Sequence, residues 1–324
     1  MASLSATCSD ARTVGDWLSG TARRLGTADP GDRLGDVLAG AFARPMDDAA
    51  YRGNALVPGG WPLEVSFSEE RPDRLRLDLQ PSDVECLPVR RRARTLTVVG
   101  RHAGTGFHRR YAAWRPYLRA DRFGAFLGAE FGPDDLTSVK AYLELDPAVA
   151  PAALPGRLGA AASMVAAHVP GVVPHLVAIG GGLDGPLERV YLACRGGLRI
   201  LALDGLLAGL GLRHRLPALA ATVAELTGGR LLLPEDAALV AVAERAGGLD
   251  LKVELLSDAL AGPAEAAIER LLLDRPSSLA AFRRWRHAVG PAVTTSVVSV
   301  RLAGDSPPRL NVYQRIAAPD RLRP

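Results

Sequence analysis

The segment from 62 to 81 alternates between apolar and polar residues. Because successive side chains of a β-strand point to opposite faces, its apolar positions share one face and its polar positions share the other. A short polar stretch, 69–73, divides the segment, which therefore predicts a β-hairpin. One face of this hairpin would be apolar, and the other would carry Glu64, Arg74 and Arg76.

Similar alternating segments recur along the chain, and the stretches between them have apolar residues at helical spacing. The further expected strands are 137–145, 173–180, 187–195, 238–245, 249–256, 294–304 and 309–316. The expected helices are 10–26, 32–44, 107–128, 148–168, 203–212, 216–227, 258–273 and 277–288, and Pro116 is expected to kink or split the third of them. This order of two helices and two strands recurs about five times, with a period of roughly 50 residues, which indicates a repeat architecture.

Consecutive hairpins separated by helices permit two α+β architectures. An open sheet would bury its apolar face under the helices and leave its polar face in water. Alternatively, about ten antiparallel strands could close into a barrel inside a ring of helices, which removes the exposed strand edges. We expect the closed barrel, whose polar faces would line a lumen wide enough for ligands. One domain is expected over 1–324, with N-terminal helices in 1–50 and the repeated units in 51–324.

Composition narrows the class of protein. The 324 residues are 48% hydrophobic and 23% charged, as is typical of globular proteins. No apolar run reaches the roughly 18 residues of a membrane helix, and the N-terminus does not resemble a signal peptide. Three widely spaced cysteines fit a reducing cytoplasm. A net charge of +4 without a basic stripe argues against a nucleic-acid partner, and the basic cluster 89–94 is predicted to be a solvated loop or helix end.

Lysine is rare in this chain, because only two of its 39 basic residues are lysines. Both lie on the polar face of the second strand of an expected hairpin. A second polar or aromatic residue follows each of them two positions later, on the same face. The pairs in this phase are Lys140 with Tyr142, Arg189 with Tyr191, Lys252 with Glu254, and Asn311 with Tyr313.

These motifs resemble those of the aromatic prenyltransferases with the ABBA (PT) barrel, in particular the dimethylallyltryptophan synthase branch. That branch opens its barrel with a Pro-x-Glu-x-Ser strand, paired with an Arg-x-Ser-x-Glu-Pro strand, and its later strands carry Lys-x-Tyr. Here the first two strands read Pro62-Leu-Glu64-Val-Ser66 and Arg76-Leu-Asp78-Leu-Gln80-Pro81. The resemblance runs from about residue 50 to the C-terminus and implies a closed barrel of helix–helix–strand–strand units.

The resemblance also implies an activity, the transfer of a dimethylallyl or longer prenyl group from an allylic diphosphate to an electron-rich aromatic ring. In this Friedel-Crafts-like alkylation, fixed cations surround the diphosphate and aromatic faces shield the allylic cation. The implied diphosphate-binding residues are Arg76, Lys140, Arg189, Lys252 and Arg309. The implied shield and substrate-binding residues are Tyr142, Tyr191, Tyr313 and Asn311. Glu64 would be the catalytic carboxyl group, either as a base or as a hydrogen-bond acceptor for an indole N–H.

Partners and cofactors follow from the same resemblance. The chain has no Asp-rich metal motif of the DDxxD kind, so we expect no metal cofactor, with Mg²⁺ at most stimulatory. The expected partners are an allylic diphosphate and an aromatic acceptor, most simply an indole or tryptophan-type compound, although a phenol or a peptide side chain fits as well. We expect a monomer or homodimer that binds neither nucleic acid nor membrane. The short chain suits a bacterial, cytoplasmic enzyme of specialised metabolism, such as alkaloid biosynthesis.

Two departures from the family pattern leave a second interpretation open. Leu187 stands where the family has an arginine, and Glu254 stands where it has a tyrosine. The first change removes a cation from the expected diphosphate site, and the second adds a carboxylate near it. The alternative to an enzyme is therefore a barrel that has lost its chemistry and binds a small molecule or a peptide.

Overall fold

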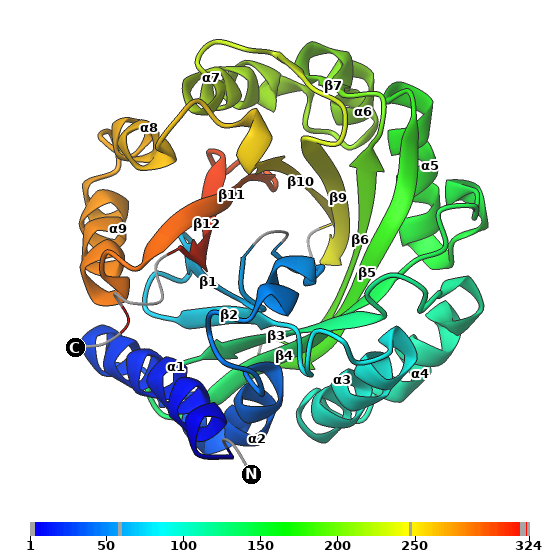
Figure 1. The fold of residues 1–324 in the computed structure, drawn as a ribbon. Coiled ribbons are helices and arrows are strands. Elements are labelled where there is room, and N and C mark those ends of the chain that lie inside the picture. The colour runs from blue at the N-terminus through cyan, green and yellow to red at the C-terminus, as the bar shows by residue number, and fades with distance from the viewer. Residues whose placement is uncertain (1–3, 58–59, 184, 246–247, 318–321, 323–324) are drawn as a thin grey trace.

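Ten antiparallel strands close into a barrel at the centre of the molecule (Figure 1). The computed structural model describes residues 4–57, 60–183, 185–245, 248–317 and 322. Around the barrel the strand order is β1-β12-β11-β10-β9-β6-β5-β4-β3-β2, so strands adjacent in sequence are mostly adjacent in space. The closed barrel expected from the sequence is confirmed, and the open sheet is wrong.

The barrel strands match the alternating segments of the sequence, except that β3 begins within the helix expected over 107–128. They are β1 (Leu63–Ser68), β2 (Leu75–Leu79), β3 (Ala125–Phe131), β4 (Leu136–Glu144), β5 (Val172–Gly182), β6 (Gly185–Cys194), β9 (Ala238–Arg245), β10 (Gly248–Leu256), β11 (Val293–Leu302) and β12 (Arg309–Ile316). Two further short strands, β7 (Leu198–Arg199) and β8 (Leu232–Leu233), pair with each other outside the barrel.

Helices form a ring around the barrel, in chain order from α1 in blue to α9 in orange (Figure 1). They are α1 (Leu4–Leu25), α2 (Gly31–Ala41), α3 (Pro88–His102), α4 (Phe107–Trp114), α5 (Gly156–His168), α6 (Asp204–Gly209), α7 (Leu216–Thr227), α8 (Ala264–Leu271) and α9 (Pro276–Val289). The repeat unit between β4 and β5 has one α-helix in place of two, because a short 3-10 turn, Pro151–Ala153, stands where its first helix is expected.

The hydrophobic core lies between the outer face of the barrel and the helices. Phe67 of β1 is fully buried, and its ring centroid lies 5.3 Å from that of Phe282 and 6.4 Å from that of Trp285, both on α9. Burying a side chain of this size contributes about 1.5–3 kcal/mol. The apolar positions of the strands therefore face outward, which leaves the polar positions of the same strands facing the lumen.

The first helix packs against the last one and completes the ring. The indole Nε1 of Trp17 donates a hydrogen bond to the carbonyl oxygen of Val289 at 3.1 Å. Arg24 Nε donates to the carbonyl oxygen of Ala288 at 2.8 Å. Figure 1 shows α1 beside α9, so segments from the two ends of the chain hold the ring together.

The helix expected over 107–128 is wrong in its second half. Helix α4 ends at Trp114, a 3-10 turn follows over Arg115–Tyr117, and the chain then enters β3. Pro116 lies in this 3-10 turn, and a proline lacks the backbone N–H that an α-helix needs, so the helix does not continue past it. Gly124, just before β3, has a φ of +72°, and a Cβ there would lie 2.0 Å from the carbonyl oxygen of Pro88 in α3.

The basic cluster 89–94 forms the first turns of α3, as the helix-end alternative predicted, but it is only partly solvated. Arg91 is only 3% exposed, and its guanidinium donates to the backbone carbonyl oxygens of Val84, Cys86 and Phe123. This arginine is therefore a structural element that ties α3 to the loops around it.

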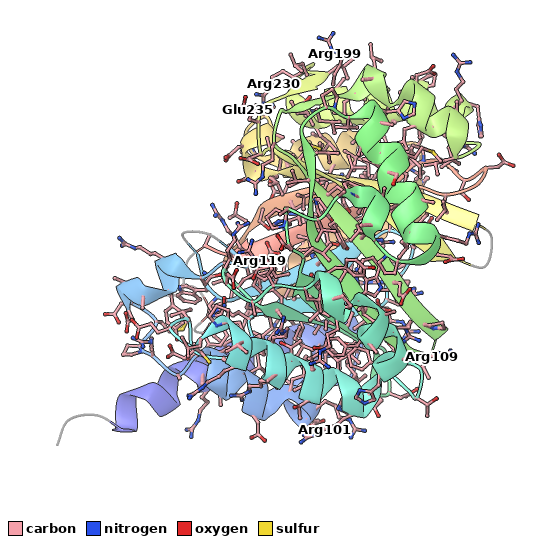
Figure 2. All side chains as sticks on the ribbon, turned by 90° about the vertical axis from the view of Figure 1, so that its right-hand side faces the viewer. Arg101, Arg109, Arg119, Arg199, Arg230 and Glu235 are labelled. Carbon is pink, nitrogen blue, oxygen red and sulfur yellow. The ribbon has the colours of Figure 1, made fainter. Side chains whose placement is uncertain are left out.

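Exposed arginines are spread over the outer surface. Arg199 and Arg230 lie at one end of the view in Figure 2, and Arg101 and Arg109 lie toward the other. Within the described ranges, every helix is too short or too polar to cross a membrane.

Candidate active site

The barrel lumen contains a cavity of about 730 Å³. This volume is in the range of sites that bind small molecules. Its lining is drawn from several strands and is largely polar. The sequence-predicted residues in the lining are Arg76, Lys140, Arg189, Lys252 and Asn311. The structure therefore brings together side chains that the sequence places on β2, β4, β6, β10 and β12.

Lys252 is the most deeply buried of these cations, with an exposed fraction of 1%. Its Nζ donates a hydrogen bond to the hydroxyl of Tyr313 at 2.7 Å and lies 2.5 Å from Glu254 Oε1. It also lies 4.9 Å from the ring centroid of Tyr313 and 5.9 Å from that of Tyr191. One ammonium group thus lies within cation–π distance of two aromatic rings, which stabilises its charge inside the lumen.

Lys140 occupies a similar position on β4. Its Nζ lies 4.8 Å from the ring centroid of Tyr142 and 4.0 Å from Asp78 Oδ1. Burial lowers the pKa of Lys140 to about 8, and the nearby Arg76 acts in the same direction, while the charge of Asp78 opposes it. This lysine is therefore a cation that an additional anion in the cavity would stabilise.

The predicted tyrosines lie next to the cations, in the direction away from the hairpin turns. Tyr142 and Tyr191 meet edge to face, with ring centroids 6.1 Å apart. Both belong to a separate apolar cluster inside the barrel, which includes Phe126 and Leu176. Burial raises the pKa of Tyr191 to about 12, so its ring stays neutral at ordinary pH. The lumen is thus divided into a charged part and an aromatic part.

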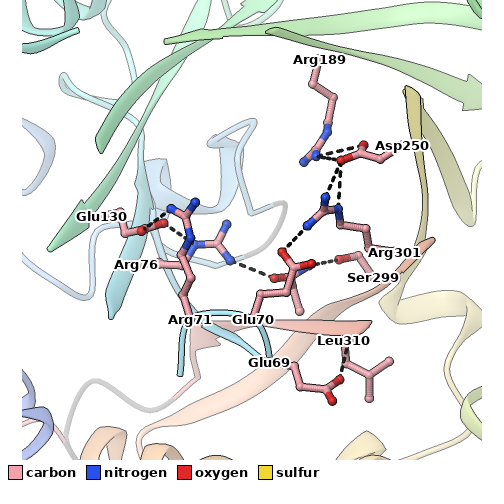
Figure 3. Close-up of polar contacts among 11 residues, drawn as sticks. Glu69, Glu70, Arg71, Arg76, Glu130, Arg189, Asp250, Ser299, Arg301 and Leu310 are labelled. Atoms are coloured by element: carbon pink, nitrogen blue, oxygen red, sulfur yellow. Dashed lines mark hydrogen bonds and ion pairs between the residues drawn. The ribbon is translucent and has the colours of Figure 1, made fainter. Parts of the chain in front are cut away.

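Arg76 is held by an acidic partner and an amide. Its Nε lies 3.5 Å from Glu130 Oε2, and its Nη1 donates to Asn311 Oδ1 at 3.0 Å. Glu130 is shared with Arg71, whose Nη1 lies 2.8 Å from the other carboxylate oxygen. Figure 3 shows Glu130, Arg71 and Arg76 together at the left of the view. Asn311 in turn donates a hydrogen bond to Ser299.

A second cluster occupies the other side of Figure 3. Asp250 is 2% exposed and accepts hydrogen bonds from Arg189 at 3.3 Å and from Arg301 at 2.9 Å. Arg301 also forms an ion pair with Glu70, which comes from the turn between β1 and β2. Both guanidiniums line the cavity, so Asp250 holds two cations side by side.

Arg301 is a lining residue that the sequence analysis did not select. It lies on β11, directly opposite Lys252 of β10 in the strand register. The other lumen-facing residues of β11 are small, such as Ser299, so the strand gave little sign of a polar site. The available signal was the alternation itself, because Arg301 has the same parity as Ser299. Arg301 thus supplies a cation to the cavity in which Leu187 stands at the position of the family's arginine.

Arg309 is the predicted cation that the structure does not bring to the cavity. Its Nη1 lies 2.8 Å from Glu69 Oε1, and Arg275 of the chain segment before α9 lies 2.7 Å from the same oxygen. Glu69 also accepts a hydrogen bond from the backbone nitrogen of Leu310 (Figure 3). This buried carboxylate holds Arg309 at the rim of the barrel, because β12 begins at that residue.

Glu64 lies on β1, opposite Asp78 rather than Arg76 in the strand register. It accepts a hydrogen bond from Ser296 Oγ at 2.5 Å, and it is 7% exposed. Burial raises the pKa of Glu64 to about 8, and the charges of Asp78 and Glu254 add to this effect. At neutral pH this carboxyl group is therefore mostly protonated. Arg76, which lies on the same hairpin face and lines the cavity, pairs with Glu130.

The two departures from the family motifs have defined surroundings. Leu187 lines the cavity near its mouth, on the same face of β6 as Arg189. Glu254 forms the short ion pair with Lys252, so the added carboxylate directly neutralises a predicted diphosphate ligand. Among the described residues, no group of three or more His, Cys, Asp or Glu side chains is placed to hold a metal ion.

Carboxylates pair with the cations of the lumen in general. Each of the lining cations has a carboxylate oxygen within 4.0 Å. The pairs are Arg71 and Arg76 with Glu130, Lys140 with Asp78, Arg189 and Arg301 with Asp250, and Lys252 with Glu254. A bound anion would therefore compete with these carboxylates for the same donors.

A closed barrel of ten strands with a ring of helices and a cation-lined lumen defines a class of fold, the PT barrel of the aromatic prenyltransferases. The 5-dimethylallyl tryptophan synthase of Streptomyces coelicolor, solved in complex with DMASPP and Trp, is 18% identical, with a TM-score of 0.69. The match covers 95% of this chain and 94% of that one.

Two further structures have the same fold. A 6-dimethylallyl tryptophan synthase is 16% identical with a TM-score of 0.74, and the match covers 95% of this chain and 98% of that one. The 6-dimethylallyltryptophan synthase of Micromonospora olivasterospora, in complex with DMASPP and Trp, is 18% identical with a TM-score of 0.70, covering 93% and 97%. No protein-family model matches the chain, and no curated protein sequence matches it either.

Proposed function

We propose that the protein is an aromatic prenyltransferase that transfers a dimethylallyl or longer prenyl group from an allylic diphosphate to an indole or tryptophan-type acceptor. The observation that carries the proposal is the layer of lysines and arginines directly beside a layer of tyrosine rings. Lys252 touches Tyr313 and faces Tyr191, and Lys140 faces Tyr142. Diphosphate on the cations would leave the allylic carbon against the rings.

In this proposal the diphosphate is bound by Arg76, Lys140, Arg189 and Lys252. Arg301 supplies a further cation, which compensates for the leucine at position 187, where the family has an arginine. Charge-assisted hydrogen bonds stabilise the leaving diphosphate as the allylic C–O bond breaks. Tyrosine faces then stabilise the allylic cation and exclude water. The acceptor ring attacks this cation, and Asn311 is a further polar contact.

Glu64 is proposed to bind the N–H of the acceptor from a position beside Asp78, its register partner, which lines the cavity where Glu64 itself does not. A mostly protonated carboxyl group still offers a carbonyl oxygen as a hydrogen-bond acceptor. We propose that the reaction needs no metal, that the protein works in a bacterial cytoplasm as a monomer or homodimer, and that it belongs to specialised metabolism such as alkaloid biosynthesis. DMASPP and Trp are bound in the similar synthase of Streptomyces coelicolor, so a dimethylallyl donor and tryptophan are the first molecules to test.

The direct experiment is an incubation of the protein with dimethylallyl diphosphate and L-tryptophan, tryptamine or indole, followed by mass spectrometry. We expect a product that is heavier by one C₅H₈ unit, with diphosphate released in equal amount. No product with any of these acceptors, under conditions where the protein is folded, would contradict the proposal.

A binding protein without chemistry remains the second candidate, and the short ion pair between Lys252 and Glu254 favours it. A cation neutralised at 2.5 Å has less attraction to offer an incoming diphosphate. The two candidates differ in the ligand that the lumen binds. The binding protein would hold an aromatic ligand without measurable affinity for dimethylallyl thiolodiphosphate, whereas the enzyme would bind this analogue.

A further inference from the structure

Prenyl transfer to an aromatic ring requires a group that removes a proton from the ring after the new bond has formed. The inference here rests on the proposed function and concerns which carboxylate does this. Such a group must reach the reacting carbon, so it has to border the cavity at the junction between the cations and the tyrosines. It must also be ionised and not engaged by several cations at once.

Asp78 of β2 meets the requirement of position. Its side chain lines the cavity, and its residue is 6% exposed. The carboxylate oxygen Oδ1 lies 4.0 Å from Lys140 Nζ, and that ammonium group lies 4.8 Å from the ring centroid of Tyr142. Asp78 is thus located where the charged part of the lumen meets the aromatic part.

Gly128 of β3 opens the space in which Asp78 and Lys140 meet. These residues belong to adjacent positions of β2, β3 and β4, because Asp78 pairs with Gly128 and Gly128 pairs with Lys140. A Cβ on Gly128 would lie 2.7 Å from Asp78 Oδ1 and 2.3 Å from Lys140 Cε. The absence of a side chain there lets both charged groups extend over β3 into the cavity.

The other lumen carboxylates are less suitable as proton acceptors. Glu130 and Asp250 each pair with two arginines, and Glu254 pairs with Lys252 at the short distance of 2.5 Å. A carboxylate held by several charge-assisted hydrogen bonds is a weaker base. Asp78, by contrast, has its ion pair with one ammonium group at the longer distance of 4.0 Å.

Glu64 is placed differently from Asp78, although the two face each other across β1 and β2. Within the part of the chain that the structure describes, the cavity lining includes Asp78 and not Glu64. Glu64 is held by Ser296 and keeps its proton up to a pKa of about 8. Two adjacent carboxyl groups in unlike surroundings can take the roles of a neutral hydrogen-bonding group and a charged base.

We propose that Asp78 is the catalytic base, which accepts the proton from the ring carbon after prenyl transfer. The allylic C–O bond breaks, and diphosphate leaves with the electron pair. A C–C bond then forms between the allylic cation and the ring. The C–H bond at that ring carbon breaks, its electron pair restores the aromatic system, and the proton moves to Asp78. Lys140, which forms the ion pair with Asp78 and is one of the proposed diphosphate ligands, then stabilises the product diphosphate.

The test uses the full chain with dimethylallyl diphosphate and whichever of L-tryptophan, tryptamine or indole the wild type prenylates. We expect Asp78→Ala to lower the single-turnover rate by about 10²–10⁴, the usual effect of losing a general base. Affinity for dimethylallyl thiolodiphosphate is retained or increases, because Lys140 loses its carboxylate partner. Added formate, a small soluble base, should restore part of the rate of Asp78→Ala by about tenfold or more.

Glu130→Ala is the matched control, because it also removes a cavity carboxylate but leaves Asp78 in place. Its rate should not respond to formate, whatever its effect on donor affinity. Asp78→Asn keeps the side-chain volume and serves if Asp78→Ala does not fold, as judged by thermal unfolding. A single-turnover rate within about twofold of wild type in either Asp78 variant would overturn the inference.

Loss of donor-analogue binding in both Asp78 variants, without any response to formate, would also overturn it and make Asp78 a positioning residue for Lys140. These outcomes differ from failure of the proposed function itself. That failure would appear in the wild type, as no prenylated product and no binding of the analogue.

Discussion

At the scale of single residues, the sequence was informative about the basic side chains that line the cavity and silent about their carboxylate partners. The two lysines stood out because lysine is otherwise absent, and strand alternation placed them on the polar face. Both line the cavity. Strand alternation also indicated that Arg301 faces the lumen, but the contacts of Arg301 and of the carboxylates could not be predicted, because they depend on the register of strands far apart in sequence. The pairing of Lys252 with Arg301 across β10 and β11 is an example.

A substitution at Lys252 tests the cation site directly. Lys252→Ala removes a charge-assisted hydrogen-bond donor, so the dissociation constant of dimethylallyl thiolodiphosphate should rise by an amount equivalent to about 1.5–3 kcal/mol. The change also leaves Glu254 buried without its partner. Lys252→Ala combined with Glu254→Gln is therefore the better-folded form for calorimetric titration. Unchanged affinity in both forms would show that Lys252 is not a donor ligand.

The buried carboxyl group of Glu64 makes stability depend on pH. Its pKa is raised from an unfolded value of 4.5 to about 8 by burial, with Asp78 and Glu254 adding to the shift and Ser296 and Arg315 opposing it. Between these two pH values the folded state keeps a proton that the unfolded state releases. The contribution of Glu64 to the free energy of unfolding therefore falls as pH rises through this window.

Glu64→Gln isolates this effect because it cannot ionise. The variant should gain stability relative to wild type between about pH 5 and about pH 8, by an amount on the order of a few kcal/mol. Urea unfolding at the two pH values measures it. A difference between wild type and Glu64→Gln that does not change with pH would mean that Glu64 titrates normally.

At the scale of elements, alternation predicted the strands well, and helical spacing predicted most helices. The failure at 107–128 has a local cause, since the apolar spacing continues past Trp114, while Pro116 ends the helix there. The close approach of Gly124 to Pro88, just before β3, comes from the packing of α3 and has no signal in the local sequence. The bounds of an element are thus less predictable than its existence.

Two glycines offer a matched test of this interpretation. Gly104 and Gly124 have similar positive φ values, +78° and +72°, but a Cβ would meet no atom within 4 Å at Gly104 and the Pro88 carbonyl at 2.0 Å at Gly124. Gly104→Ala should cost about 1–2 kcal/mol for the backbone conformation alone. Gly124→Ala should cost about 1–3 kcal/mol more because of the clash. Equal losses in chemical denaturation would show that the close approach to Pro88 is unimportant.

At the scale of the whole molecule, the barrel was predictable because each hairpin has one apolar and one polar face. Closure of the barrel turns the polar face of each hairpin toward one lumen. Residues from five strands therefore lie close together there, although the local sequence does not indicate which of them become neighbours. The balance of charge in that lumen was not predictable. It arises because Glu130 and Asp250 each bridge two arginines, which are brought together by the register of neighbouring strands and by the turn that carries Arg71.

The central claim is that the lumen binds an allylic diphosphate through its cations, with the prenyl chain against the tyrosines. A crystal structure of the protein soaked with dimethylallyl thiolodiphosphate is the most direct measurement. We expect diphosphate oxygens at hydrogen-bond distance from Lys140, Lys252 and Arg189, with the carboxylates of Asp78 and Glu254 displaced, and the dimethylallyl group beside Tyr142 and Tyr191. A lumen without the analogue at saturating concentration, or an analogue bound only at the outer surface, would contradict the account.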